Sequence, residues 1–337
     1  MHPLRRKLLA KALAATALGR FAAHGLARPS AMRAAARSAH GVAQFSSLAL
    51  AQVPALAAAQ NPATLTKAIP STGEPLPVVG LGTARRYESA ASRAEQAVLR
   101  DTLGEFVALG DSVIDTAPTY GDAERVVGEL VAAMGIRDRL FLATKVSTTG
   151  REAGAAQIEQ SFARLRTTTI DLIAVHNLRD TAIHLRTLRK LKQAGRIRYV
   201  GITTSFDRQY PEFEETMKRE TLDFIQVDYA LDNREAGERI LPLARERRMA
   251  VMVNLPFGRG RLFQAIRGRP LPGWASEFDC RSWAQFFLKY IVSHQAVTCA
   301  VPGMARPEYV RDNLGAARGR LPDAAMRRRM ESFIDAL

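Results

Sequence analysis

From residue 64 onward, short apolar runs alternate with longer segments that carry apolar residues at helical spacing. Such runs are typical of buried strands, and strands that alternate with helices predict parallel βαβ units. The predicted strands are residues 78–83, 112–115, 141–144, 171–175, 198–202, 223–227, 250–253 and 297–301. Eight such units match the usual size of one barrel, so the pattern predicts an α/β fold with a single (β/α)8 TIM barrel domain over residues 64–337.

A second, shorter pattern precedes the first predicted strand. Residues 67–70 and 75–78 flank the turn-like tetrapeptide Ser71-Thr72-Gly73-Glu74. Two short runs around such a turn predict a β-hairpin. We expect this N-terminal hairpin to cap the bottom of the barrel.

The charge of the chain is distributed unevenly. The formal net charge is +15, yet residues 1–73 contain no Asp or Glu and hold nine of the 48 Lys and Arg residues. The rest of the chain therefore has 39 basic against 33 acidic side chains. Nucleic-acid binding requires a basic stripe on the folded domain, so the composition predicts no nucleic-acid partner.

Residues 1–60 are predicted to be a targeting leader. Arg5 and Arg6 precede an apolar run that ends at Leu18, which is typical of a twin-arginine export signal. A second apolar run, residues 42–59, ends at a small-residue site that signal peptidase accepts, and Met32 would be the start of a leader built on that run. Both starts predict recognition by export machinery and a periplasmic location.

Other interpretations of the leader stay open. An acid-free segment with Arg and Ser is also typical of an organellar transit peptide, and an Ala-rich tail on a cytoplasmic protein has the same composition. Polar residues interrupt or bound both apolar runs, so we expect no transmembrane span in the mature protein. The two cysteines, Cys280 and Cys299, are too few for a disulfide framework and are expected to be unpaired, with Cys280 opening a helix.

Polar side chains stand at the ends of three consecutive predicted strands. Asp115 ends the second strand and Tyr120 follows five residues later, Lys145 follows the third strand, and His176 follows the fourth. Each alone has an ordinary explanation: a turn cap, a packing aromatic, a solvated lysine or a structural histidine. Because barrels place their chemistry at the C-terminal ends of strands, the four together predict a catalytic site, and no metal site is predicted.

The order Asp115, Tyr120, Lys145, His176 resembles the catalytic tetrad of the aldo/keto reductases. The segment from Asp115 to Glu124, with Gly128 downstream, resembles the family signature around the tetrad Asp and Tyr. The resemblance implies hydride transfer from a nicotinamide to a carbonyl carbon, with Tyr120 as the proton donor. Lys145 would lower the pKa of Tyr120, Asp115 would hold Lys145, and His176 would orient the carbonyl oxygen.

The resemblance also implies an NADPH site. Gln226 would contact the nicotinamide amide, the loop 256–260 would lie along the pyrophosphate, and the segment after the eighth strand would hold the adenosine phosphate end, where barrels often bind phosphate. The coenzyme-binding residues so predicted are Gly82, Thr83, Thr203, Thr204, Gln226, Pro256, Gly258, Gly260, Pro302, Gly303, Arg306 and Asn313. Arg306 near the expected 2′-phosphate favours NADPH over NADH.

Two departures from the family pattern concern the same site. Thr203-Thr204 stands where many members have Ser-Asn, and Asn254 stands where many members stack a Tyr on the nicotinamide. We expect an NADPH-dependent reductase that acts on small aldehydes or ketones. Rival interpretations are a non-enzymatic NADPH-binding scaffold or redox-sensing subunit, and an unrelated barrel that binds an anion at its Arg-rich loop, 259–269. Trp274 and Trp283 are candidates for the wall of the substrate pocket.

Overall fold

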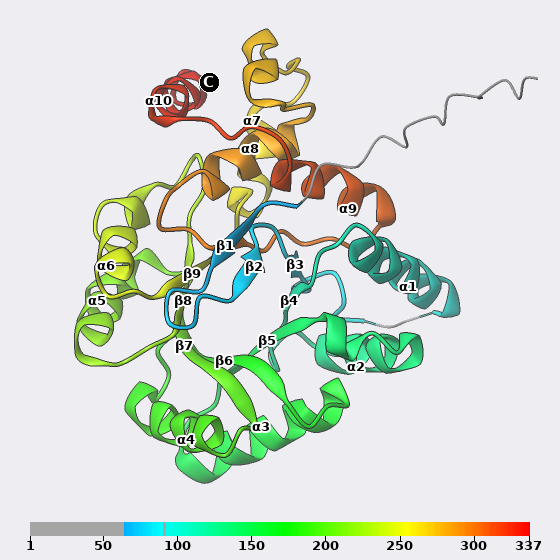
Figure 1. Ribbon diagram of the computed structural model, residues 1–337, viewed down its shortest axis with the longest axis vertical. Coiled ribbons are helices and arrows are strands. Elements are labelled where there is room, and N and C mark those ends of the chain that lie inside the picture. The colour runs from blue at the N-terminus through cyan, green and yellow to red at the C-terminus, as the bar shows by residue number, and fades with distance from the viewer. Residues whose placement is uncertain (1–63, 90–91) are drawn as a thin grey trace, which may run out of the picture. The chain divides into compact units, whose positions relative to one another are not determined.

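The computed structural model describes residues 64–89 and 92–337, so the predicted leader, residues 1–60, lies outside the described residues. Eight parallel strands form one curled sheet in sequence order (Figure 1). They are β3 (Leu81–Gly82), β4 (Val113–Asp115), β5 (Phe141–Val146), β6 (Ile170–His176), β7 (Ile197–Thr203), β8 (Phe224–Asp228), β9 (Ala250–Asn254) and β10 (Cys299–Ala300). Parallel bridges from Val79 to Ala300 and from Gly82 to Gly303 join the two edges, which is consistent with the predicted (β/α)8 architecture.

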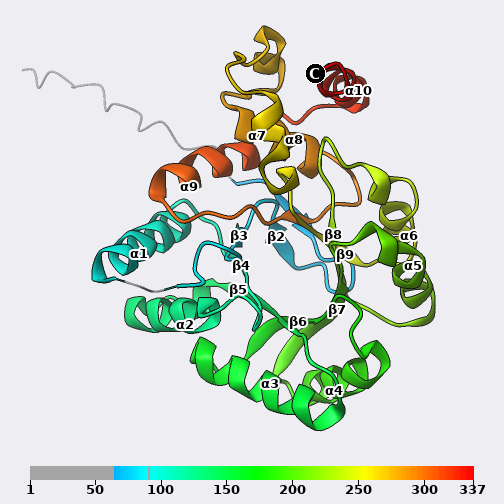
Figure 2. The same ribbon diagram turned by 180° about the vertical axis from the view of Figure 1, so that it is seen from behind.

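Helices surround the strands on the outside, as Figure 1 and the reverse view in Figure 2 show. They are α1 (Arg93–Ala108), α2 (Ala123–Met134), α3 (Arg151–Leu165), α4 (Thr181–Gln193), α5 (Tyr210–Arg219), α6 (Ile240–Glu246), α7 (Arg261–Ala265), α8 (Trp283–Val292), α9 (Pro307–Leu314) and α10 (Ala324–Asp335). Helix α9 packs against both α1 and α8 and so covers the seam where β3 meets β10. Helix α10 packs through Phe333 on Trp274, at a ring distance of 6.0 Å.

Sequence explains where several helices begin and which face they bury. Helix α1 begins after Ser92, whose hydroxyl accepts from the Glu95 backbone N–H and donates to the Glu95 carboxylate. The first of these two bonds satisfies the Glu95 N–H, which is one of the groups that a helix start leaves without a partner. Helix α8 is apolar on nearly every side and is buried from Ala284 to Val292. A helix of that kind belongs in the interior, between the sheet and the outer segments.

The predicted N-terminal hairpin forms from β1 (Thr66–Ala68) and β2 (Pro75–Pro77), which pair antiparallel. Ile69 and Leu76 belong to the same buried cluster as Phe141 and Phe224 inside the sheet. The ammonium of Lys67 donates to three backbone carbonyls at the end of α8 and in the segment after it, at 2.7 to 2.8 Å. These contacts tie the hairpin to the rest of the domain.

The first and last barrel strands are shorter than predicted. Residues 78–83 were expected to form one strand and residues 297–301 another, but the regular strands are Leu81–Gly82 and Cys299–Ala300. These edge strands are joined to each other by isolated bridges. Their backbones approach closely, and a Cβ added to Gly82 would lie 2.7 Å from the Val301 carbonyl oxygen. Close approach at this glycine was expected from the sequence.

Both cysteines are free, as expected, and both are buried. Cys280 does not open a helix, because α8 begins only at Trp283, where Ser282 supplies the N-cap. In the described part of the chain, no helix combines the length and apolar character needed to cross a membrane.

Candidate active site

The four predicted catalytic residues line one cavity of about 470 Å³ at the C-terminal ends of the strands. Asp115 ends β4, Lys145 lies in the last part of β5, and His176 is the last residue of β6. Lys145 and His176 were expected to follow their strands, but both strands extend to include them. Adjacent parallel strands set this arrangement, because residues near their C-terminal ends meet at one edge of the sheet.

Lys145 and Asp115 form a buried ion pair beside Tyr120. The Lys145 ammonium donates to both carboxylate oxygens of Asp115, at 2.8 and 3.0 Å, and to the Thr116 carbonyl at 2.8 Å. The two side chains are only 2% and 8% exposed. All three ammonium donors therefore have partners, which fixes the lysine in place. Its nitrogen lies 5.2 Å from the centre of the Tyr120 ring.

Charge and burial act in opposite directions on the two groups. Burial lowers the pKa of Lys145, but the charges and hydrogen bonds of Asp115 and Tyr120 raise it more, so the net pKa lies above its ordinary value. For Tyr120, burial raises the pKa and Lys145 lowers it, and the net pKa is raised. Lys145 therefore acts on the phenol in the expected direction, but desolvation of the phenolate outweighs the ammonium and sets the net direction of the pKa.

His176 is neutral at physiological pH. Burial, followed by the positive charges of Lys145 and Arg179, lowers the pKa of this imidazole to about 3. Its Nδ1 lies 3.5 Å from the Thr119 hydroxyl, and its ring meets the Tyr120 ring edge-on at 6.2 Å between centres. A neutral imidazole carries one N–H donor and one acceptor, so it can donate a hydrogen bond without carrying charge.

The predicted coenzyme residues fall into two groups. One group lines the cavity wall and the other does not. Lining the cavity are Gly82, Thr83, Thr203, Pro256, Gly260 and Gly303. Outside its wall are Thr204, Gln226, Gly258, Pro302, Arg306 and Asn313.

Several residues outside the cavity wall have structural contacts instead. The Pro302 carbonyl accepts from the Gly82 N–H at 2.8 Å, and Asn313 is buried in α9. Arg306, at the start of α9, is 62% exposed and lies 3.8 Å from Glu308. Gly258 lines a neighbouring cavity.

Polar atoms without partners gather at this end of the barrel. The atoms are Gln226 Nε2, Asn254 Oδ1, Asn177 Oδ1 and Thr116 Oγ1, each buried without a hydrogen-bond partner. Buried polar groups are normally satisfied, so unfilled donors and acceptors beside a cavity indicate a place for a polar ligand group. The residues present therefore fit a coenzyme whose nicotinamide carries an amide.

The sequence did not identify several residues of the cavity wall. Arg85, Arg86 and Glu88 follow β3, and Asn177 follows β6. No local pattern marks them, although their position after a predicted strand was a usable signal. The cavity also has aromatic walls, formed by Phe206, Phe257 and Phe263.

The prediction that the two tryptophans wall the pocket is wrong. Trp274 and Trp283 both pack on Phe286 and Phe333, away from the cavity, and the Trp283 indole donates to the Arg269 carbonyl at 3.0 Å. Aromatic side chains favour such clusters, and the sequence does not reveal which rings meet.

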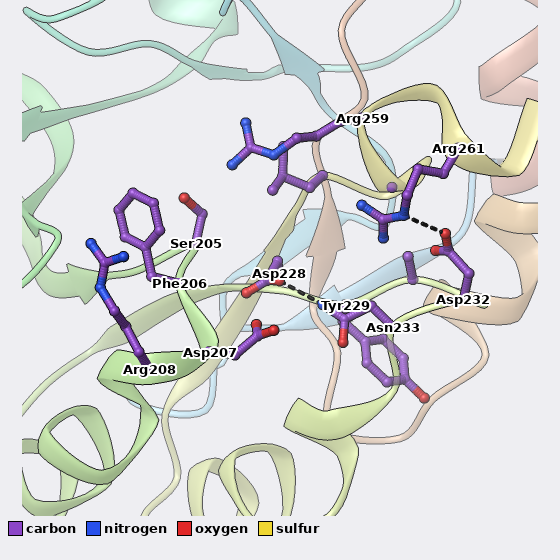
Figure 3. Close-up of a pocket in the computed structure, with 13 residues that line it drawn as sticks. Ser205, Phe206, Asp207, Arg208, Asp228, Tyr229, Asp232, Asn233, Arg259 and Arg261 are labelled. Carbon is purple, nitrogen blue, oxygen red and sulfur yellow. Dashed lines mark hydrogen bonds and ion pairs between the residues drawn. The ribbon is translucent and has the colours of Figure 1, made fainter.

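A second cavity of about 540 Å³ adjoins the first and shares four residues with it (Figure 3). Its wall carries both acidic and basic side chains. Arg261 pairs with Asp232 at 3.0 Å, and Asn233 donates to Asp228 at 2.7 Å. Arg259 reaches both cavities. Within the described ranges, no group of three or more His, Cys, Asp or Glu side chains has the arrangement of a metal site.

Comparison with known proteins identifies the family of this chain. The model of the aldo/keto reductase family matches residues 78–333. The chain belongs to the aldo/keto reductase family. A relative named methylglyoxal reductase YeaE, from Escherichia coli (strain K12), is 31% identical over 259 residues, which cover 74% of this chain and 89% of that protein.

Other members of the family are similar over comparable lengths. The NADH-specific methylglyoxal reductase of Escherichia coli (strain K12) is 24% identical, with 66% of this chain and 84% of that protein covered. Among solved structures, an aldo-keto reductase from Klebsiella pneumoniae in complex with NADPH is 26% identical, with a TM-score of 0.68. The similarity covers 81% of this chain and 95% of that one.

Proposed function

We propose that this aldo/keto reductase uses NADPH to reduce small aldehydes or ketones to alcohols. The observation that carries the proposal is the convergence of Tyr120 with the buried pair of Lys145 and Asp115, and with a neutral His176, on one cavity. Relatives named methylglyoxal reductases make methylglyoxal a suitable first substrate. The Klebsiella pneumoniae structure with bound NADPH supports the choice of coenzyme.

The coenzyme would be held by residues on two sides of the cavity. Gln226 would contact the nicotinamide amide, and the loop 256–260, which includes Arg259, would face the phosphates. When bound, the reduced nicotinamide supplies the hydride for the carbonyl carbon. Backbone N–H groups in such a loop and a nearby guanidinium suit an anion.

Tyr120 would supply the proton. Its raised pKa keeps the phenol protonated at neutral pH, which a general acid requires. As the phenol O–H bond breaks and the proton moves to the substrate oxygen, the phenolate left behind would be stabilised by the Lys145 ammonium beside it. Asp115 would keep that ammonium in place, and the neutral His176 would donate to the carbonyl oxygen and orient it.

The test uses the purified full chain with NADPH and a panel of carbonyl compounds, methylglyoxal and 4-nitrobenzaldehyde among them. Fluorescence of the coenzyme measures binding, and the loss of its absorbance measures turnover. We expect both binding and turnover. Binding without turnover of any carbonyl compound would instead favour the non-enzymatic scaffold.

We also propose that residues 1–60 direct export, by the twin-arginine route. The proposal is supported by the adjacent Arg5 and Arg6, the following apolar run and the absence of acidic residues. That route would carry a folded barrel, with its coenzyme bound, to the periplasm. In a bacterial host, Arg5→Lys together with Arg6→Lys should keep the precursor in the cytoplasm, as measured by fractionation and N-terminal sequencing. Equal export of this variant would contradict the route and favour synthesis from Met32.

A further inference from the structure

Three amide side chains around one dipeptide each hold a buried polar atom without a partner. The atoms are Asn177 Oδ1, Gln226 Nε2 and Asn254 Oδ1. Asn177 and Asn254 line the catalytic cavity. Leaving such groups unsatisfied is costly, so three of them in one place point to a missing ligand group.

The shared dipeptide is Thr203-Thr204, at the end of β7. The Asn177 backbone N–H donates to the Thr203 carbonyl at 2.8 Å, and Asn254 Nδ2 donates to the Thr204 carbonyl at 3.2 Å. Gln226 Oε1 accepts from the Thr203 hydroxyl at 3.0 Å. The three residues therefore belong to one contiguous set, placed directly after β6, in the middle of β8 and at the end of β9.

The two threonine hydroxyls already have partners. That of Thr203 donates to Gln226, and that of Thr204 donates to Gln209 Oε1 at 2.6 Å and accepts from the Phe206 N–H at 3.2 Å. The two threonines that replace the Ser-Asn of many family members thus use their hydroxyls in hydrogen bonds within the protein. The unfilled hydrogen-bonding capacity lies on the neighbouring amides instead.

The unfilled atoms are two acceptors and one donor. A primary carboxamide has two N–H donors and one carbonyl acceptor, which is the complementary set. We propose that Asn177 and Asn254 are specificity-determining residues that accept from the amino group of the nicotinamide carboxamide, while Gln226 donates to its carbonyl oxygen. This inference rests on the proposed function, because it requires a nicotinamide coenzyme in the cavity.

The proposal gives position 254 a different task from that of the tyrosine found there in many relatives. A tyrosine offers its face to the nicotinamide ring, whereas Asn254 offers an amide oxygen to the substituent on the ring. Coenzyme binding should therefore depend more on the carboxamide than on the ring face. A coenzyme analogue that changes only the carboxamide distinguishes binding through the carboxamide from binding through the ring face.

The test compares binding of oxidised NADP with binding of its 3-acetylpyridine analogue to the full chain. The analogue keeps the carbonyl and all phosphates but has a methyl group in place of the amino group. Each lost hydrogen bond should weaken binding roughly two- to tenfold. We expect the wild-type protein to prefer NADP by at least that factor, as measured by titration calorimetry.

Asn254→Leu should weaken NADP binding by a similar factor and leave binding of the analogue unchanged. Asn177→Gly should act in the same direction, and glycine suits the positive φ of 52° at that position. Asn233→Ala is the matched control, because Asn233 lies in the neighbouring cavity and donates to Asp228. This control should keep the wild-type ratio of the two dissociation constants, and thermal melting should show that every variant is folded.

Three results would overturn the inference. They are equal binding of NADP and the analogue by the wild-type protein, equal weakening of both ligands by Asn254→Leu, and unchanged NADP binding in both asparagine variants. If the wild-type protein binds neither ligand, the proposed function itself fails. Binding and turnover with an unchanged ratio in the variants would leave the proposed function standing and remove only the role of the asparagines.

Discussion

Replacing Asp115 by Asn removes the carboxylate that the Lys145 ammonium contacts and leaves a buried positive charge without its counter-charge. Lys145 is 2% exposed, so water cannot replace the lost partner. Breaking a buried ion pair by removing one member costs about 3 to 5 kcal/mol, whereas the loss of an exposed pair costs about 1 kcal/mol or less. We expect Asp115→Asn to fall in the first range.

In a domain of this size, each kcal/mol lowers the melting temperature by roughly 2 to 4 °C. The expected loss is therefore on the order of 10 °C, accompanied by a loss of turnover. Lys145→Met should cost a similar amount, because it leaves the buried Asp115 carboxylate without its counter-charge. The double variant should cost clearly less than the two single changes added together, because it removes both charges.

Chemical and thermal unfolding followed by circular dichroism measures these differences. Arg125→Met serves as the control, because Arg125 and its partner Asp122 are 41% and 54% exposed. A cost for Asp115→Asn no greater than that of the control would contradict the reasoning. Strict additivity of the two single changes would contradict it too, since it would mean that the charges do not interact.

Three further predictions concern stability and the coenzyme. Burial raises the pKa of Asp111 to about 7, so the stability conferred by its protonated form is present in full below about pH 4 and is lost as the pH rises through 7. Asp111→Asn should remove this loss, which amounts to about 4 kcal/mol for a shift of about three pKa units. The measurement is the free energy of unfolding as a function of pH, and equal slopes for the wild-type protein and the variant would contradict the prediction. Gly128→Ala should destabilise the protein by more than about 1 to 3 kcal/mol, because a Cβ there would lie 2.1 Å from the backbone oxygen of Arg164; an unchanged melting temperature would refute this. Arg306→Ala should raise the dissociation constant of NADPH and leave that of NADH unchanged, and equal changes in both titrations would count against a role at the 2′-phosphate.

Much of the fold was predictable because its signals are local. Apolar runs mark the strands of a parallel sheet whatever the rest of the chain does, and the position of a residue at a strand end determines which edge of the sheet it reaches. Asp115, Lys145 and His176 could therefore be placed together before any contact was known. The short strands β3 and β10 were less predictable, because the length of regular pairing depends on the partner strand, and these two strands meet only through isolated bridges.

The parts of the site that were not predicted depend on tertiary structure. The pKa of Tyr120 reflects how deeply the phenol is buried, and the sequence does not contain that depth. Asn177 reaches the cavity through a left-handed backbone conformation. Asparagine tolerates this conformation, but its presence in a sequence does not predict it. Trp274 and Trp283 pack on other aromatic rings, and these contacts form only when the segment before α8, helix α8 and helix α10 come together.

The central claim is that Tyr120 donates the proton in carbonyl reduction. Tyr120→Phe removes the phenol oxygen and little volume, so NADPH affinity should stay within a few-fold while turnover of methylglyoxal falls by about 100-fold or more. Tyr199→Phe is the control, because Tyr199 lies in the buried cluster near the hairpin, and its loss should leave turnover unchanged. The decisive measurement is the rate of NADPH oxidation by the folded, coenzyme-bound Tyr120→Phe variant. A rate close to wild type would contradict the account, and loss of the chemical step with binding retained is the result it predicts.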